Sequence, residues 1–92
     1  MGRTPRERPA RLAAKLVHVR TALNLSQGEM IYRLGLQDNL TREEISKYER
    51  GLRVPSLLTL LKYARVVNLT VDYLIDDEMD LPERLPGSSV KT

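Results

Sequence analysis

Apolar residues recur at intervals of three and four along most of the chain, which is the spacing of one helix face. The first such set predicts a helix over residues 9–23, with Pro9 near a position that a first helical turn tolerates. Its apolar face consists of Leu12, Leu16, Val19 and Leu23. A second set predicts a helix over residues 57–67, with Ser56 as its cap. Its inward face consists of Leu57, Leu60, Leu61, Ala64 and Val67. No run alternates with a period of two, so we predict no strand.

Three further helix starts share one pattern, Asn-Leu-Ser/Thr followed by two variable residues, a Glu or Tyr, and an apolar residue. Residues 24–30, 39–45 and 68–74 carry it. Ser26 and Glu29 have the spacing of a capping box, in which each side chain binds a free backbone N–H of the other residue. Thr41 and Glu44 repeat this box, whereas Thr70 keeps the cap without the Glu. The pattern predicts helices over residues 27–34, 42–50 and 71–76, with Gly35 and Gly51 ending the first two.

These five helices predict an all-α fold, a compact bundle with an apolar core built without Phe, Trp or Cys. Ninety-two residues suit one domain, which we place at residues 9–78. Residues 1–8 have the composition of a flexible basic arm, and residues 79–92 that of a mobile C-terminal tail. We expect the three tyrosines at positions 32, 63 and 73 to lie at the edge of the core.

The net charge of +3 is unevenly distributed. Residues 1–23 carry six basic side chains against Glu7, residues 24–53 are balanced, and residues 54–92 are acidic. A basic front suits a protein that presents one face to a polyanion, although a solvated charged surface is the alternative. With no Cys and a single His, the chain has no thiolate or His-cluster metal site and no Cys or His for catalysis. We therefore expect no bound metal, no cofactor and no enzymatic activity. It has no apolar run of the length that a membrane span or signal peptide needs, so we expect a cytoplasmic protein.

A short helix, a glycine, a connection and a second short helix with a polar outer face form the outline of a helix-turn-helix. Specific residues occur in register with this outline: Leu25-Ser26-Gln27, Leu34-Gly35, Ile45-Ser46-Lys47-Tyr48-Glu49-Arg50-Gly51, Pro55-Ser56 and Leu60-Leu61-x-x-Ala64. Over about residues 11–76 the chain closely resembles the Cro and phage-repressor type (XRE-type) helix-turn-helix family. The resemblance implies a five-helix bundle that binds double-stranded DNA, with the helix at residues 42–50 in the major groove.

The resemblance also implies roles for single residues. Arg42, Glu43, Ser46 and Lys47 would contact bases, because Arg and Lys reach guanine O6 and N7 while Glu accepts from cytosine N4. Gln27, Asn39, Arg50 and Arg53 would contact phosphates. Arg20 and Glu49 would form a structural ion pair that holds the DNA-reading helix against the bundle.

Two features depart from the family pattern. The link from Gly35 to Thr41 is longer than in relatives, which changes the approach of the following helix. Asn39 or Gln37 in this link contacts a phosphate or belongs to a solvated loop. Glu43 lies at the end of the DNA-reading helix that would face the DNA. Its negative charge beside the phosphates is unfavourable unless its carboxylate accepts a hydrogen bond from a base.

Relatives bind two-fold operators as dimers, which implies a homodimer. We expect its interface on the fourth and fifth helices, because more apolar residues occur there than one small core buries. They are Leu58, Val66, Leu74, Ile75, Met79 and Leu81. The alternative function is a protein-interaction module or an antitoxin-like protein, favoured by the acidic segment at residues 76–80.

Overall fold

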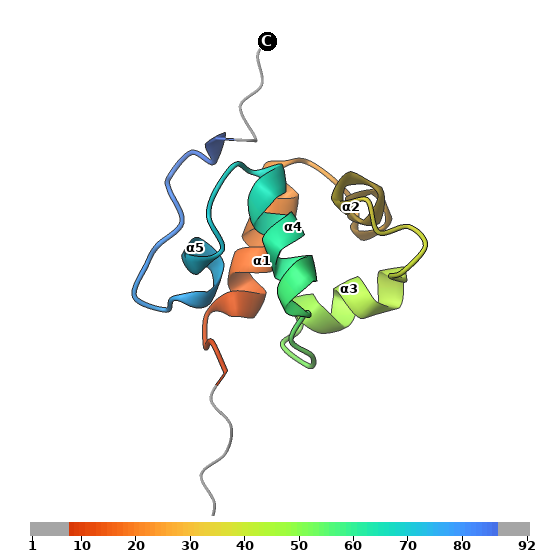
Figure 1. Ribbon diagram of the computed structural model, residues 1–92, viewed down its shortest axis with the longest axis horizontal. Helices are drawn as coiled ribbons and strands as arrows, with labels where there is room; N and C mark the ends of the chain where they lie inside the picture. The colour runs from red at the N-terminus through yellow and green to blue at the C-terminus, as the bar shows by residue number, and fades with distance from the viewer. Residues whose placement is uncertain (1–7, 87–92) are drawn as a thin grey trace, which may run out of the picture.

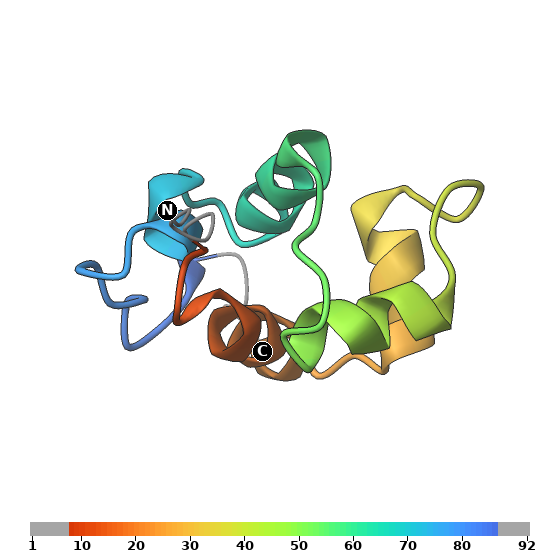
Figure 2. The same cartoon turned by 90° about the horizontal axis from the view of Figure 1, so that it is seen from below.

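The computed structural model describes residues 8–86 and contains five α-helices within that range. They are α1 (Leu12–Ala22), α2 (Gln27–Leu34), α3 (Arg42–Glu49), α4 (Leu57–Val66) and α5 (Asp72–Ile75). α1 and α4 lie at the centre, α2 and α3 on one side, and α5 with the segment that follows it on the other (Figure 1). Figure 2 shows the same division from below. No strand occurs in the described part of the chain, so the predicted all-α bundle is confirmed.

Three of the four predicted caps start their helices as expected, and one of them is Ser56, whose hydroxyl accepts from the Thr59 N–H at 3.2 Å. The Ser26 hydroxyl accepts from the Glu29 N–H at 3.0 Å, and the Glu29 carboxylate accepts from the Ser26 N–H at 2.8 Å. The box of Thr41 and Glu44 is also complete. Thr70 is different: the residue that caps α5 is Val71, without a side-chain hydrogen bond. The Thr70 hydroxyl binds the Asp72 carboxylate instead, so the predicted cap at Thr70 is wrong.

Four helices end at a residue with positive φ that is followed by a leucine. These residues are Asn24, Gly35, Gly51 and Asn68, with φ between 58° and 75°. In each case the following leucine donates its N–H to the carbonyl five residues back, as Leu25 does to Arg20 and Leu69 to Ala64. This is the six-to-one bond of a Schellman motif. The glycines were predicted. The two asparagines were not, and they give the repeated Asn-Leu-Ser/Thr pattern a second meaning in two of its three copies: Asn24 ends α1 just before Ser26 begins α2, and Asn68 ends α4.

The core gathers between the helices, with residues from all five of them and from the segment after α5, and its most central side chains are fully buried. They include Leu16, Val19, Met30, Ile45 and Tyr63. Complete burial of an aliphatic side chain contributes about 1.5–3 kcal/mol, so this cluster dominates stability. Two expectations about the core are wrong. Leu57 is 80% exposed, because it lies in the first turn of α4, whose inward face is filled by Leu60, Tyr63, Ala64 and Val67. Tyr32 is exposed, and Tyr63 lies in the core rather than at its edge.

The segment after α5 is part of the folded domain. Leu85 is buried, Leu81 packs against the core, and residues 76–86 run along the bundle beside α1 and α5 (Figure 1). The predicted tail at residues 79–92 is therefore wrong as far as residue 86, because Leu81 and Leu85 supply apolar surface that the composition of this segment did not reveal. Residues 87–92 and the arm at residues 1–7 lie outside the described range. α1 begins at Leu12, three residues later than predicted.

Candidate nucleic-acid interface

The third helix buries one side and exposes a polar side. Ile45 and Tyr48 are its buried residues, and burial raises the pKa of the Tyr48 hydroxyl. On the opposite side Arg42 and Glu43 are exposed, whereas Ser46 and Lys47 are half-buried. The four residues predicted to contact bases therefore lie on one accessible surface of α3.

A nearly buried ion pair joins α3 to α1. The Arg20 guanidinium binds both carboxylate oxygens of Glu49, from Nε at 2.6 Å and from Nη2 at 3.0 Å. Its Nη1 donates to the Leu25 carbonyl at 2.8 Å, which ties the α1–α2 turn to the same group. The hydrogen bonds that Arg20 donates to Glu49 raise the pKa of Arg20, and only 6% of the Glu49 side chain is exposed. The predicted pair is thus present, and its geometry is bidentate.

Glu49 has a further partner that the sequence did not predict. The side-chain amide of Gln27, the first residue of α2, donates from Nε2 to Glu49 Oε1 at 3.0 Å. Gln27 was predicted to bind a phosphate. It is half-buried, and it is linked through Glu49 to both α1 and α3.

Two predicted phosphate contacts have intramolecular partners. The Arg50 guanidinium donates from Nε to Ser46 Oγ at 3.1 Å, one helical turn back. Arg53 lies 4.0 Å from the Glu44 carboxylate, and both groups are substantially exposed. Exposed pairs of this kind contribute little, so both guanidinium groups remain available to a polyanion.

The first turns of α2 and α3 meet at Gly28. A Cβ added to Gly28 would lie 3.7 Å from Cδ of Arg42, so the Arg42 side chain crosses directly over this glycine. Glycine in a helix costs about 1 kcal/mol relative to alanine. A Cβ at this position would be in ordinary van der Waals contact with Arg42, so an alanine would fit here without displacing the residue predicted to read bases.

The longer link between α2 and α3 forms a compact turn. Asn39 and Leu40 both donate their N–H groups to the Leu36 carbonyl at 2.9 Å. Leu36 and Leu40 are partly buried against the core, while Asn39 is exposed at the outer side of the turn. The extra residues are therefore anchored at both ends, and α3 keeps its packing against α2.

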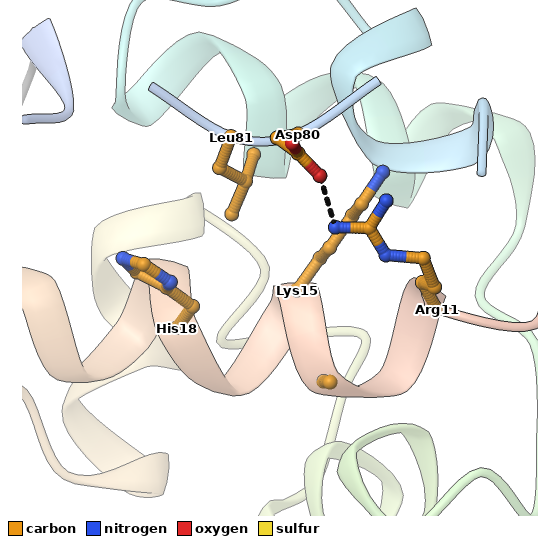
Figure 3. A pocket seen from close by; sticks show the side chains of 6 residues that line it. Arg11, Lys15, His18, Asp80 and Leu81 are labelled. Carbon is orange, nitrogen blue, oxygen red and sulfur yellow. Dashed lines mark hydrogen bonds and ion pairs between the residues drawn. The ribbon is translucent and has the colours of Figure 1, made fainter. Parts of the chain in front are cut away.

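Part of the basic front binds other parts of the chain. Asp77 accepts from the Ala10 and Arg11 N–H groups at 2.8 and 3.0 Å, and these bonds lower the pKa of the Asp77 carboxyl. Arg11 pairs with Asp80 at 2.6 Å (Figure 3). Lys15, 4% exposed, donates from Nζ to three carbonyls of residues 73–79, and burial lowers its pKa. Asp77 and Asp80 of the acidic segment therefore bind the residues at the start of α1. The positive charges of Arg11 and Lys15 are directed at the protein itself and not at a polyanion.

Beside these contacts lies an open hollow of about 310 Å³, lined by α1 and the segment after α5 (Figure 3). Its basic groups, Arg11 and Lys15, already have protein partners. Across residues 8–86 no group of His, Asp or Glu has the arrangement of a metal site. Within the same range no helix is long and apolar enough to cross a membrane.

The six residues predicted for a dimer interface differ in exposure. Leu74 is fully buried in the core, so this prediction is wrong for Leu74. Val66, Met79 and Leu81 are partly buried, and only Leu58 and Ile75 are exposed. Most of the exposed large apolar residues belong to the link before α4 and to its first turn, where Leu52, Val54, Leu57 and Leu58 are all exposed.

Comparison with known proteins gives one match. A family model described as helix-turn-helix matches residues 18–74, from the second half of α1 to Leu74 in α5. This range contains α2, α3 and the Glu49 hydrogen bonds. Neither the curated proteins nor the solved structures give a significant match.

Proposed function

The chain belongs to the Cro and phage-repressor type (XRE-type) of helix-turn-helix DNA-binding regulators, and from this premise we propose that it binds a two-fold operator as a homodimer. In this proposal α3 enters the major groove and α2 lies across the sugar–phosphate backbone. The observation that carries it is the fixed position of α3. Glu49 bonds α3 to α1 and α2 at once, while the opposite side of the helix presents a polar surface.

The proposed contacts fall into two groups by their place along α3. Arg42, Glu43, Ser46 and Lys47 contact bases, because they lie on the accessible side of the helix from its first turn onward. Gln27, Asn39, Arg50 and Arg53 contact phosphates on either side of the groove. Base contacts supply specificity, and phosphate contacts supply affinity that falls with salt.

Selection of bound duplexes from a random pool tests the function as a whole. A palindromic motif would give the half-site and its spacing, and would support a two-fold complex. Recovery of random duplexes only, with no enriched motif, would contradict sequence-specific binding.

Exchange of Arg42 and of Arg53 for alanine separates the two kinds of contact. Arg42→Ala should flatten the preference at one operator position, since a base-edge contact gives about 1–3 kcal/mol of discrimination. Arg53→Ala should weaken operator and random DNA by similar factors and lower the salt slope by about one. Both variants are measured against single-base operator mutants at several salt concentrations. Equal weakening of every site by Arg42→Ala would remove Arg42 from base reading.

The dimer in this proposal uses the exposed apolar residues at the first turn of α4, with Leu57 and Leu58 at their centre. Exposed apolar residues that follow one another closely in the chain favour an interface at this place, and a two-fold operator requires a second copy. The alternative of a protein-interaction module would use the acidic segment, in which Asp77 and Asp80 bind residues 10 and 11 of the same chain while Asp76 and Glu78 are exposed. An affinity pull-down that recovered one stoichiometric protein and no DNA would favour it.

A further inference from the structure

We infer that Glu49 is a positioning residue for DNA binding, which holds the Gln27 amide in the orientation that a phosphate requires. This inference rests on the proposed function. It assigns to the Arg20–Glu49 pair a task beyond its structural one, and it makes the phosphate contact of α2 dependent on a residue at the far end of α3.

The orientation of the Gln27 amide follows from the chemistry of its partner. A carboxylate accepts hydrogen bonds and does not donate them, so the group 3.0 Å from Glu49 Oε1 has to be the NH2 group of Gln27. One amide proton is thereby bound to Glu49. The second amide proton is left for another acceptor, and Gln27 is only half-buried, so a phosphate oxygen can reach the group.

The backbone around Gln27 points to the same ligand. The capping box uses the N–H groups of Ser26 and Glu29. The N–H groups of Gln27 and Gly28, in the first turn, have no acceptor within the helix. In the proposed complex they and the second amide proton of Gln27 donate to one phosphate, and Gly28 adds no side chain beside it. A free glutamine side chain would have to be ordered on binding, whereas the bond to Glu49 orders it beforehand.

The charge of Glu49 also requires Arg20. A bare carboxylate beside a phosphate site would repel the ligand, and Glu49 lies one hydrogen bond away from the proposed contact. The guanidinium of Arg20 covers both carboxylate oxygens and neutralises that charge. Glu49 can therefore orient Gln27 without opposing the polyanion.

The test is a double-mutant cycle between Gln27→Ala and Glu49→Met, read as affinity for a random-sequence duplex by fluorescence anisotropy at several salt concentrations. Methionine has a similar length to glutamate and cannot accept from the amide. Gln27→Ala should weaken binding by about tenfold, as expected for a hydrogen bond to a charged group. Glu49→Met should weaken it by a similar factor, and the double variant should lose no more than either single one.

The sign of the Glu49→Met effect separates positioning from electrostatics. Removal of a negative charge makes the protein more basic, so electrostatics alone predicts tighter binding. The matched control is Glu83→Met, which removes an exposed carboxylate from the segment after α5 and should bind as tightly as the wild type or slightly more tightly. Glu49→Gln, whose carbonyl can still accept from Gln27, should restore binding. Tighter binding by Glu49→Met, or losses that add in the double variant, would overturn the inference.

Thermal melting under the binding conditions shows whether Glu49→Met is folded. If it is not, the side-chain amide of Gln27 in the wild type supplies the answer by NMR relaxation. An amide as rigid as the backbone supports the inference, and one that moves freely on the nanosecond scale overturns it. A wild type that binds no duplex at low salt would contradict the proposed function, while the relaxation measurement would still report on the contact between Gln27 and Glu49.

Discussion

Tyr63 carries its hydroxyl group into the core, where no hydrogen-bond partner lies within reach among the described residues. Burial, and then the neighbouring Glu49, raise the pKa of this phenol far above its usual range, so it stays protonated. A buried polar group without a partner costs about 1–3 kcal/mol. Tyr63→Phe should therefore raise the free energy of unfolding by about 1 kcal/mol, measured by urea denaturation. Tyr32→Phe, which changes an exposed tyrosine, should leave it unchanged; a less stable Tyr63→Phe would show that the hydroxyl is bonded, for example to water.

Single residues were predicted well where their role depends on near neighbours in sequence. The spacing of Ser26 and Glu29 alone identifies the first capping box, because both partners lie in one turn. The bond from Gln27 to Glu49 joins residues 22 positions apart. It depends on how α2 crosses α3, which no local pattern encodes. The only available signal was that a polar residue with no capping role began α2 and an acidic residue faced inward on α3.

At the scale of elements, the three asparagines of the repeated pattern provide a matched comparison. Asn68 ends α4 with φ of 58°, a conformation in which a Cβ is strained, whereas Asn39 does not adopt positive φ. Asn68→Ala should lower the free energy of unfolding by about 1 kcal/mol, and Asn68→Gly should maintain or raise it. Asn39→Ala should have no such effect. Equal effects of alanine at both positions, in thermal or urea unfolding, would contradict the role assigned to Asn68 in ending the helix.

The segment after α5 should be sensitive to acid through Asp77. Two backbone N–H groups at the start of α1 lower the pKa of Asp77, so the folded state favours the charged carboxylate. The stability from this contact is complete above the unfolded pKa of about 4 and is lost as pH falls through the lower folded value. Asp77→Asn should therefore be less stable than the wild type at neutral pH, and the two should converge in acid. Unfolding followed against pH tests this, with Glu83→Gln as a control that should track the wild type.

The helices were predictable from sequence to within a few residues, whereas the end of the domain was not. Periodicity places α2 and α3 because apolar residues, caps and terminal glycines agree there. Residues 79–86 carry Pro82, Pro86 and little periodicity, and this composition resembles a tail. Leu85 is nevertheless buried and Lys15 donates to the Met79 carbonyl. These contacts are long-range, so they follow from the assembled bundle and not from the segment itself.

At the scale of the whole molecule, the exposed apolar residues predict which surface a second copy of the chain covers. Leu58 and Tyr32 are exposed to a similar degree, 70% and 71%. Leu58 follows the exposed Leu52, Val54 and Leu57 closely in the chain, whereas Tyr32 on α2 has no other exposed large apolar residue near it in sequence among the described residues. Leu58→Ser should therefore convert a dimer into a monomer in light scattering and weaken binding to a full operator more than to a half-site. Its melting temperature should not fall in dilute solution, because the side chain contributes little to the core. Tyr32→Ser should remain dimeric.

Loss of the dimer on Ile75→Ser but not on Leu58→Ser would move the interface to α5. A wild type that is monomeric both free and on DNA would exclude the two-fold assembly altogether.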